Sequence, residues 1–215
     1  MKYLDRRAAG TALAAALAGF DQGTAVLADG GAQPVVLGLV RGGIPVAAEV
    51  ARRLGLPLDA LVVRKLGVPW APEVAFGALG PSGVQVLIDD IAARLTAEEL
   101  SRVVQYEMSE LGRRERLYRA GQPDLDLTGR IAIVIDDGLA TGATARAAVA
   151  AVRKLGAKRV VLAVPVGAAE TLQQLGTVAD EVVCPVRPAD FGAVSRYYED
   201  FGQVSDAEVV SLLHA

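Results

Sequence analysis

The stretch IAIVIDDGLATGAT, residues 131–144, constrains the fold more than any other part of the chain. Its first five residues form a continuous apolar run, which is typical of a strand buried on both faces of a parallel sheet. Two adjacent carboxylates, Asp136 and Asp137, end the run, and a loop of glycine, alanine and threonine follows. The alanine-rich segment after this loop has a composition that favours a helix. The stretch therefore predicts a strand, a loop and a helix, with two acids where the strand ends.

Apolar runs of this kind alternate with helical patterns along the whole chain, which indicates a parallel sheet covered by helices. We therefore expect an α/β fold, Rossmann-like and doubly wound, with a mainly parallel five-stranded core sheet, helices on both faces, a small hood or cap and a mobile loop. The expected strands are residues 35–40, 61–65, 131–136, 160–166 and 181–186. The expected helices are residues 6–20, 44–54, 97–118, 143–155, 168–175 and 206–213.

The chain of 215 residues is long enough for one α/β domain with a substantial core, so we expect a single domain over residues 1–215. Within it, residues 66–84 have a weak pattern rich in glycine and proline, which predicts a mobile loop or a hairpin. Residues 187–215 are expected to form a C-terminal cap segment. The charged and then apolar N-terminus is similar to a signal peptide, but Leu13, Leu17 and Phe20 recur at helical spacing, which favours an amphipathic helix.

Composition excludes several functional classes. The net charge of −3 and the pI of about 5.3 argue against a nucleic-acid partner, which usually binds a basic face. No apolar run reaches the ~18 residues that a membrane span requires, so no membrane partner is expected. Cys184 is the only cysteine, which fits a reducing compartment, and we expect a cytoplasmic protein. His214 is the only histidine, which argues against a histidine triad or a histidine-rich metal site.

The loop after the acids has the features of an anion site. Gly138 and Gly142 allow backbone N–H groups to converge, and the following helix directs its positive end to the same point. Thr141 and Thr144 can add hydroxyl donors. The lysine of a Walker A loop is missing, and the spacing does not match the dinucleotide-binding fingerprint. Phosphate is the usual occupant of such a loop.

Two carboxylates beside a phosphate loop would repel the phosphate unless something lies between them. A ribose fits this position, because its hydroxyls can donate to Asp136 and Asp137 while its 5′-phosphate occupies the loop. Mg²⁺ would supply the remaining positive charge. A simpler interpretation is a capped strand–turn–helix in which Asp137 is the N-cap. That interpretation explains one acid, but not the acid pair together with the glycine-rich turn.

At these residues the chain resembles the type I phosphoribosyltransferases, whose signature is an apolar strand, two acids and a loop ending in Thr-Gly-x-Thr or similar. The segment VIDDGLATGAT fits this signature over its whole length. The resemblance implies an enzyme that binds 5-phosphoribosyl 1-pyrophosphate (PRPP) with Mg²⁺, transfers phosphoribose to a nitrogenous acceptor such as a nucleobase, and releases pyrophosphate. Asp136 and Asp137 would be catalytic and would hold Mg²⁺, partly through water or the ribose hydroxyls. The 5′-phosphate would lie in the loop of Gly138, Leu139, Ala140, Thr141, Gly142, Ala143 and Thr144.

Two further segments extend the resemblance. LVRGGIPVA, residues 39–47, looks like the family's pyrophosphate loop, in which Val40, Arg41, Gly42 and Gly43 would bind pyrophosphate and Arg41 would be catalytic. That loop often carries a non-proline cis peptide, so we expect one between Val40 and Arg41. Taken alone, the segment is also consistent with a glycine turn that precedes a helix with Pro45 in its first turn.

The second segment, VVRKLGVPWAPEVAFGALG, is similar to the Arg-Lys step that leads into the mobile loop of orotate phosphoribosyltransferases. Lys65 would be catalytic, and both Arg64 and Lys65 would bind the pyrophosphate. The following glycine and prolines suit a lid that closes over substrate, with Trp70 and Glu73 as members. The alternative interpretation is that Arg64 and Lys65 are solvated charges at a strand end.

The acceptor stays open at this point. Ala140 replaces the aspartate that 6-oxopurine enzymes carry in the phosphate loop, which counts against hypoxanthine or guanine but leaves adenine open. Phe191 is the expected base-binding residue, whereas Tyr197, Tyr198 and Phe201 suit a small cap core.

Family resemblance alone implies a homodimer. A PRPP-binding regulatory or sensor protein with little or no turnover is the alternative function. The arginines at the end of the long predicted helix would complement its negative terminus in solvent; they are Arg113, Arg114, Arg116 and Arg119.

Overall fold

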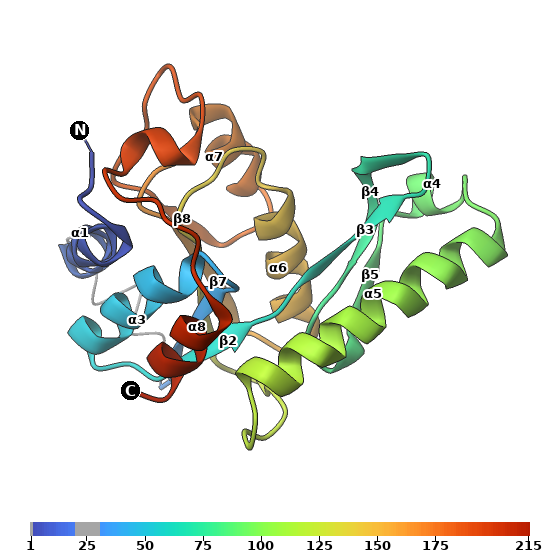
Figure 1. The fold of residues 1–215 in the computed structure, drawn as a ribbon, viewed down its shortest axis with the longest axis horizontal. Helices are drawn as coiled ribbons and strands as arrows, with labels where there is room; N and C mark the ends of the chain where they lie inside the picture. Colours follow the sequence, from blue (N-terminus) through green and yellow to red (C-terminus); the bar gives the residue numbers. More distant parts are fainter. Residues whose placement is uncertain (1, 20–30) are drawn as a thin grey trace.

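The computed structural model describes residues 2–19 and 31–215 and contains two sheets (Figure 1). The larger sheet has five parallel strands in the spatial order β2-β1-β6-β7-β8, which confirms the predicted α/β fold. Its strands are β1 (Pro34–Leu39), β2 (Leu58–Leu61), β6 (Ile131–Ile135), β7 (Arg159–Ala163) and β8 (Glu181–Val183). The apolar runs form strands because both faces of this sheet are covered.

Helices cover the two faces of the parallel sheet. On one face, α1 (Arg6–Gly19) and α3 (Gly43–Leu54) pack against the apolar side chains of β1 and β6. On the other face lie α6 (Ala143–Lys154) and α7 (Ala169–Leu175). Leu13 and Leu17 of α1 are fully buried, which confirms the amphipathic first helix, whereas Phe20 lies outside the described residues. None of the helices within residues 2–19 and 31–215 is long and apolar enough to cross a membrane.

The order of the strands along the chain determines where a ligand site can form. β1 and β6 are neighbours, but the chain continues from β1 to β2 on one side and from β6 to β7 on the other. Such a switch point leaves a crevice at the carboxyl ends of the two central strands, where open α/β sheets bind ligands. The segments that leave these ends are residues 40–43 and 136–142. The two predicted ligand loops are therefore brought together by topology.

The second sheet corrects one predicted strand. We expected residues 61–65 to form a single core strand, but β2 ends at Leu61 and residues 64–68 belong to a different sheet. That sheet is antiparallel and consists of β3 (Arg64–Val68), β4 (Ala71–Leu79) and β5 (Gln85–Leu87). It extends away from the parallel sheet alongside α5 (Ala97–Tyr118) (Figure 1). The hairpin expected within residues 66–84 is thus part of a three-stranded arm.

The long helix α5 begins as predicted. The Thr96 hydroxyl accepts a hydrogen bond from the Glu99 N–H, and the Glu99 carboxylate accepts one from the Thr96 N–H, which completes a capping box. At the other end of α5, Arg119 is not simply solvated, because it donates two hydrogen bonds to Asp59 at 2.8 and 2.9 Å. Arg113 pairs with Glu110. Arg119 therefore connects the end of α5 to β2, whereas Arg113 pairs within α5.

The remaining elements are short. A 3₁₀ turn (Pro81–Gly83) and α4 (Asp89–Ala92) flank β5, and a second 3₁₀ turn (Val194–Tyr197) lies in the C-terminal segment before α8 (Asp206–Leu213). The C-terminal segment is bound to the start of the chain by backbone hydrogen bonds. Tyr3 N–H donates to the Tyr197 carbonyl at 2.8 Å, and the N–H groups of Glu199 and Asp200 donate to the carbonyls of Tyr3 and Leu4. Residues far apart in sequence are therefore joined above the sheet.

Glu49 of α3 joins α1 to α3. Its side chain is only 5% exposed and accepts hydrogen bonds from Arg52 and Arg53 and from the Thr11 hydroxyl of α1. The hydrogen bond from Arg52 is the main reason that the pKa of Glu49 falls to about 2, from 4.5, although burial opposes this shift. The ionised form is therefore stabilised in the folded protein.

We predict that this carboxylate makes the free energy of unfolding depend on pH. Because the folded-state pKa lies below the unfolded value, the contribution is fully present above about pH 4.5 and is lost as the pH falls toward 2. The contribution is at most about 3 kcal/mol. The Glu49→Gln variant should lose about 2 kcal/mol of its free energy of unfolding at pH 7 and show a flatter pH dependence in denaturant titrations.

The control is Glu98→Gln, which removes an exposed pair with Arg102 and should change the free energy of unfolding by less than about 0.5 kcal/mol. Equal slopes for the wild type and Glu49→Gln between pH 5 and 2.5 would contradict the prediction.

Candidate active site

Asp136 and Asp137 follow β6 directly, and both are half-buried at the edge of the sheet. The Asp137 N–H donates to Asp136 Oδ1 at 2.9 Å, and Asp137 Oδ2 accepts from Arg6 Nε at 2.9 Å. Among the described residues, no hydrogen-bond donor reaches the second oxygen of either carboxylate. Each acid therefore keeps one oxygen available to a ligand.

The electrostatics of the pair are those of two carboxylates that are poorly solvated. Burial raises the pKa of Asp136 well above its usual range, and the negative charge of Asp137 raises it further. Burial also raises the pKa of Asp137, while the hydrogen bond from Arg6 opposes the change. A ligand that brings positive charge or hydroxyl donors to this point would favour the ionised forms of both acids.

The loop after the acids is closely packed on one side and open on the other. The Leu139 N–H donates to the Val166 carbonyl at 2.9 Å, and the Thr171 hydroxyl donates to the Ala140 carbonyl at 2.6 Å. Gly142 has φ +70°, and a Cβ there would lie 2.6 Å from the Thr171 methyl group, so both the conformation and the space require glycine. These contacts fix the loop against the end of β7 and α7.

The open side of this loop presents backbone donors. Within residues 2–19 and 31–215, the N–H groups of residues 141–144 have no hydrogen-bond acceptor, and Thr141, Ala143 and Thr144 are exposed. They lie at the N-terminus of α6, where the helix dipole is positive. The arrangement has the donor set of an anion site.

The glycine loop after β1 lies directly against the acids. The peptide between Val40 and Arg41 is cis, which confirms that expectation. A Cβ on Gly42 would overlap Asp137 Oδ2, and a Cβ on Gly43 would lie 2.5 Å from the Ile135 carbonyl oxygen. Glycine at these two positions therefore lets the loop approach the end of β6 to backbone contact. The loop predicted for pyrophosphate and the loop predicted for phosphoribose form one wall.

A cavity of about 390 Å³ opens between the glycine loop after β1, Asp137 and the C-terminal segment. Arg41, Gly42 and Asp137 line one side of it, and residues 201–204 line the other. Arg6 also lines the cavity and was not among the residues predicted from the sequence. In the sequence, Arg6 is distinguished only by its position in the first helix, directly after Asp5. Its partner Asp137 is 131 residues away.

Arg41 is held by a carboxylate of the C-terminal helix. Its Nη1 lies 3.4 Å from Asp206 Oδ1, and the Tyr118 hydroxyl donates to the same oxygen at 2.7 Å. Burial raises the pKa of Tyr118 to about 12, and the carboxylate of Asp206 adds to this effect. Arg41 is still one-third exposed. An anion in the cavity could therefore compete with Asp206 for this guanidinium group.

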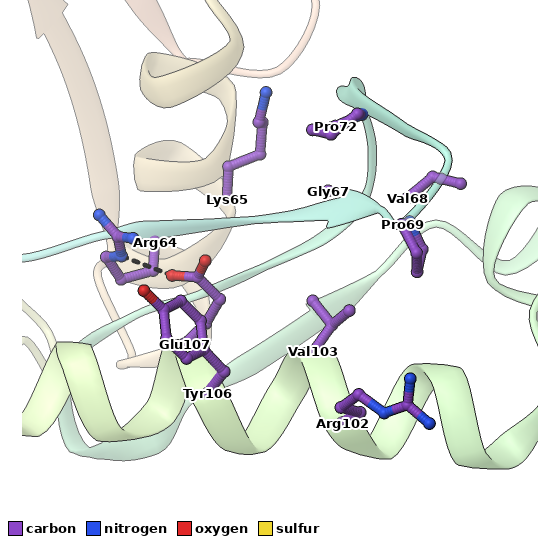
Figure 2. A pocket seen from close by; sticks show the side chains of 10 residues that line it. All are labelled: Arg64, Lys65, Gly67, Val68, Pro69, Pro72, Arg102, Val103, Tyr106 and Glu107. Atoms are coloured by element: carbon purple, nitrogen blue, oxygen red, sulfur yellow. Dashed lines mark hydrogen bonds and ion pairs between the residues drawn. The ribbon is translucent and has the colours of Figure 1, made fainter.

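Arg64 and Lys65 line a different cavity, with a volume of about 610 Å³, between the arm and α5. Figure 2 shows that they project to opposite sides of β3. Arg64 Nε donates to Glu107 Oε2 of α5 at 2.6 Å, whereas Lys65 points away from α5 (Figure 2). Val68, Pro69 and Pro72 of the arm line the same cavity, and its other wall is α5, with Arg102, Val103, Tyr106 and Glu107. The structure thus brings Arg41, Gly42 and Asp137 together, and places the Arg64–Lys65 pair in the arm.

Phe191, the expected base-binding residue, is largely buried. It is 9% exposed and stacks on Tyr197 with ring centroids 5.5 Å apart. Tyr3, Val166 and Tyr198 belong to the same apolar cluster, so the expected cap core includes Phe191. Its stacking on a base stays a prediction. The Tyr198 hydroxyl, in contrast, donates to the backbone carbonyl of Asp137 and connects the cap core to the acids.

Comparison with known proteins identifies the family. The phosphoribosyl transferase domain matches residues 3–201, a range that includes both acids and both loops. The chain belongs to the phosphoribosyl transferase domain family. The match covers the parallel sheet, the arm and the C-terminal segment up to residue 201, before α8.

Individual relatives agree with this family. Two proteins of Mycobacterium tuberculosis, provisionally named phosphoribosyl transferases MT0597 (strain CDC 1551) and Rv0571c (strain H37Rv), are each 51% identical over 181 residues, or 83% of this chain. The chain spans only 41% of the length of these relatives. The crystal structure of TT1426 from Thermus thermophilus is 43% identical, with a TM-score of 0.87 over 99% of this chain and 98% of that one. The whole fold, including the arm, is therefore shared with a solved structure.

This family typically uses Mg²⁺ together with PRPP, and Asp136 and Asp137 are the residues of this site that could hold the ion. The described residues contain no group of three or more Asp, Glu, His or Cys side chains that could form a closed metal site. Mg²⁺, however, is usually held by one or two carboxylates together with substrate oxygens and water. The free oxygens of Asp136 and Asp137 match that requirement. The site thus fits a cation that arrives with its substrate.

Proposed function

We propose that this protein is a phosphoribosyltransferase that binds PRPP with Mg²⁺, transfers phosphoribose to a nitrogenous acceptor, expected to be a nucleobase, and releases pyrophosphate. The observation that carries the proposal is the placement of two partly free carboxylates between a loop of unpaired N–H groups and the Gly42–Gly43 backbone. This order matches the order of groups along PRPP, which are the 5′-phosphate, the ribose hydroxyls and the diphosphate. Family membership supports the same order.

Each end of the substrate has a counterpart in the site. The 5′-phosphate would accept hydrogen bonds from the N–H groups of residues 141–144 and from the hydroxyls of Thr141 and Thr144. The ribose hydroxyls would donate to the free oxygens of Asp136 and Asp137. The diphosphate would lie beside Arg41 and the backbone of Gly42 and Gly43. Mg²⁺ bound with the substrate would be held at the two acids and would neutralise part of the diphosphate charge.

The chemistry then needs no protein nucleophile. The C1–O bond to pyrophosphate breaks with its electron pair leaving on the diphosphate, a C1–N bond forms to the acceptor, and the acceptor nitrogen loses its proton to water. Positive charge that develops on the ribose is stabilised by the acids, and negative charge on the leaving group by Arg41. Lys65 would reach the diphosphate only if the arm moves over the site. We assign this closing movement to residues 66–84.

The test is PRPP binding followed by turnover. PRPP with Mg²⁺ should raise the melting temperature of the protein, and a panel of purine and pyrimidine bases should release pyrophosphate with at least one member. Ribose 5-phosphate should protect more weakly, because it lacks the diphosphate. No thermal protection by PRPP at millimolar concentration would sink the proposal.

A PRPP-binding regulator is the second candidate, and one observation favours it. Arg64 and Lys65 line a cavity apart from the acids, so Arg41 is the only cation of the predicted leaving-group set that lines the cavity at Asp137, within the described part of the chain. Thermal protection by PRPP without pyrophosphate release for any acceptor would select this candidate. A homodimer remains our expectation for either function.

A further inference from the structure

We propose that Arg6 is a positioning residue that holds the Asp137 carboxylate in the orientation required to receive the ribose hydroxyls. This inference rests on the proposed function, since it concerns the same sugar-phosphate site. It gives the N-terminal helix a part in substrate binding, in addition to its packing on the sheet.

The first observation is that one guanidinium group makes three different contacts. Arg6 Nε donates to Asp137 Oδ2 at 2.9 Å, and Nη1 donates to the Gly202 carbonyl at 2.7 Å. The group also lies over the ring of Phe201, 4.0 Å from its centroid. The side chain is only 12% exposed. The N-terminal helix and the C-terminal segment therefore meet at Asp137 through Arg6. The planar guanidinium group can donate hydrogen bonds in its plane while its face stacks on an aromatic ring.

The second observation is the constraint on Asp137. Its Oδ2 atom is placed between Arg6 and the backbone of Gly42, and its carbonyl oxygen accepts a hydrogen bond from Tyr198. With Oδ2 engaged, Oδ1 is the atom left for a ligand. Without Arg6, the carboxylate could rotate, and its charge would be balanced less well beside Asp136.

The third observation separates positioning from structural support. The C-terminal segment is attached to the N-terminus independently of Arg6, by three backbone hydrogen bonds at Tyr3 and Leu4. Tyr3 is itself held to the core, because its hydroxyl donates to the Pro165 carbonyl after β7 at 3.0 Å. Arg6 is therefore not required for this attachment. We therefore assign the contact between Arg6 and Asp137 to the ligand site.

The experiment compares two ligands that differ in the ribose. Binding of ribose 5-phosphate and of inorganic phosphate is measured by calorimetric titration for the wild type, Arg6→Gln and Arg6→Lys. For Arg6→Gln we expect ribose 5-phosphate to bind about tenfold more weakly, the size of effect seen when a residue that orients a ligating group is removed. Phosphate binding should be unchanged, because phosphate needs only the loop of residues 141–144. Arg7→Gln is the control, because Arg7 is 77% exposed and should affect neither ligand.

The outcomes are separable. Unchanged ribose 5-phosphate binding in Arg6→Gln, or an equal loss for both ligands, would overturn the inference and leave the proposed function intact. Wild-type protein that binds neither ribose 5-phosphate nor PRPP would remove the inference together with the proposed function. If Arg6→Gln does not fold, Arg6→Lys decides the matter. Lysine keeps the charge but not the fork, so it should bind phosphate normally and ribose 5-phosphate roughly threefold more weakly than the wild type.

Discussion

The Asp137→Asn variant is expected to bind PRPP roughly 100-fold more weakly in the presence of Mg²⁺ and to lose turnover by at least as much. The substitution keeps the shape of the side chain but removes the charge that the ribose and the cation require. The fold should persist, because Arg6 keeps its contacts with Gly202 and Phe201, and Asp136 loses a repulsive neighbour. Thermal melts with and without PRPP, followed by calorimetry, measure both quantities.

A matched control is available outside the site. Asp124 is an exposed aspartate before β6, and Asp124→Asn makes the same change in net charge. Its PRPP affinity should equal that of the wild type. If Asp137→Asn retains the full thermal protection by PRPP, the assignment of the acid pair is wrong, for the enzyme and for the regulator alike. If it melts far below the wild type without ligand, the acid is instead mainly structural.

The sequence predicted the central part of the molecule well because its signals are local. Residues 131–144 carry a buried strand, a loop and a helix start in one continuous segment, and all three lie where expected. The capping box at Thr96 and Glu99 is equally local. The loops after β1 and β6 meet because parallel neighbours end at the same edge of the sheet, which follows from the strand pattern alone.

The second core strand could not be bounded in this way. The run of residues 61–68 is almost continuously apolar apart from Arg64 and Lys65, and nothing in its periodicity marks where it leaves one sheet for another. β2 ends at Leu61, and Val62 belongs with Leu66 to the apolar cluster shared by the arm and α5. Tertiary packing therefore places Lys65 in the arm and not in the core sheet. One residue of the expected pyrophosphate site thus lies apart from the others.

Arg6 was missed for a different reason. A single arginine in an N-terminal helix has no motif around it, and its partners are 131 and about 200 residues away in sequence. The packing of Phe191 against Tyr197 was not predicted on similar grounds, since Tyr197 was assigned to the cap core without it. Sequence spacing identifies residues that act within one segment, whereas these side chains depend on the way distant segments close over the sheet.

The Gly43→Ala variant is expected to destabilise the fold by about 3 kcal/mol and to abolish PRPP binding. Gly43 is the first residue of α3, and a Cβ there would lie 2.5 Å from the Ile135 carbonyl oxygen and 3.0 Å from Asp136 Cα. Both atoms belong to the backbone at the end of the buried strand β6, which cannot move aside as a flexible side chain would. The glycine loop would have to shift away from the acids, so stability and ligand binding should fall together.

Gly112→Ala tests whether any glycine substitution has this effect. Gly112 lies within α5, where the nearest atom to a new Cβ is the flexible Arg116 Nη1 at 3.3 Å, and alanine there should add roughly 0.5–1 kcal/mol through helix propensity. Denaturant titration and PRPP calorimetry are run on both variants. A Gly43→Ala protein with wild-type stability and PRPP affinity would show that backbone contact between the two loops is not required. The proposal that the two loops form one wall of the ligand site would then have to be abandoned.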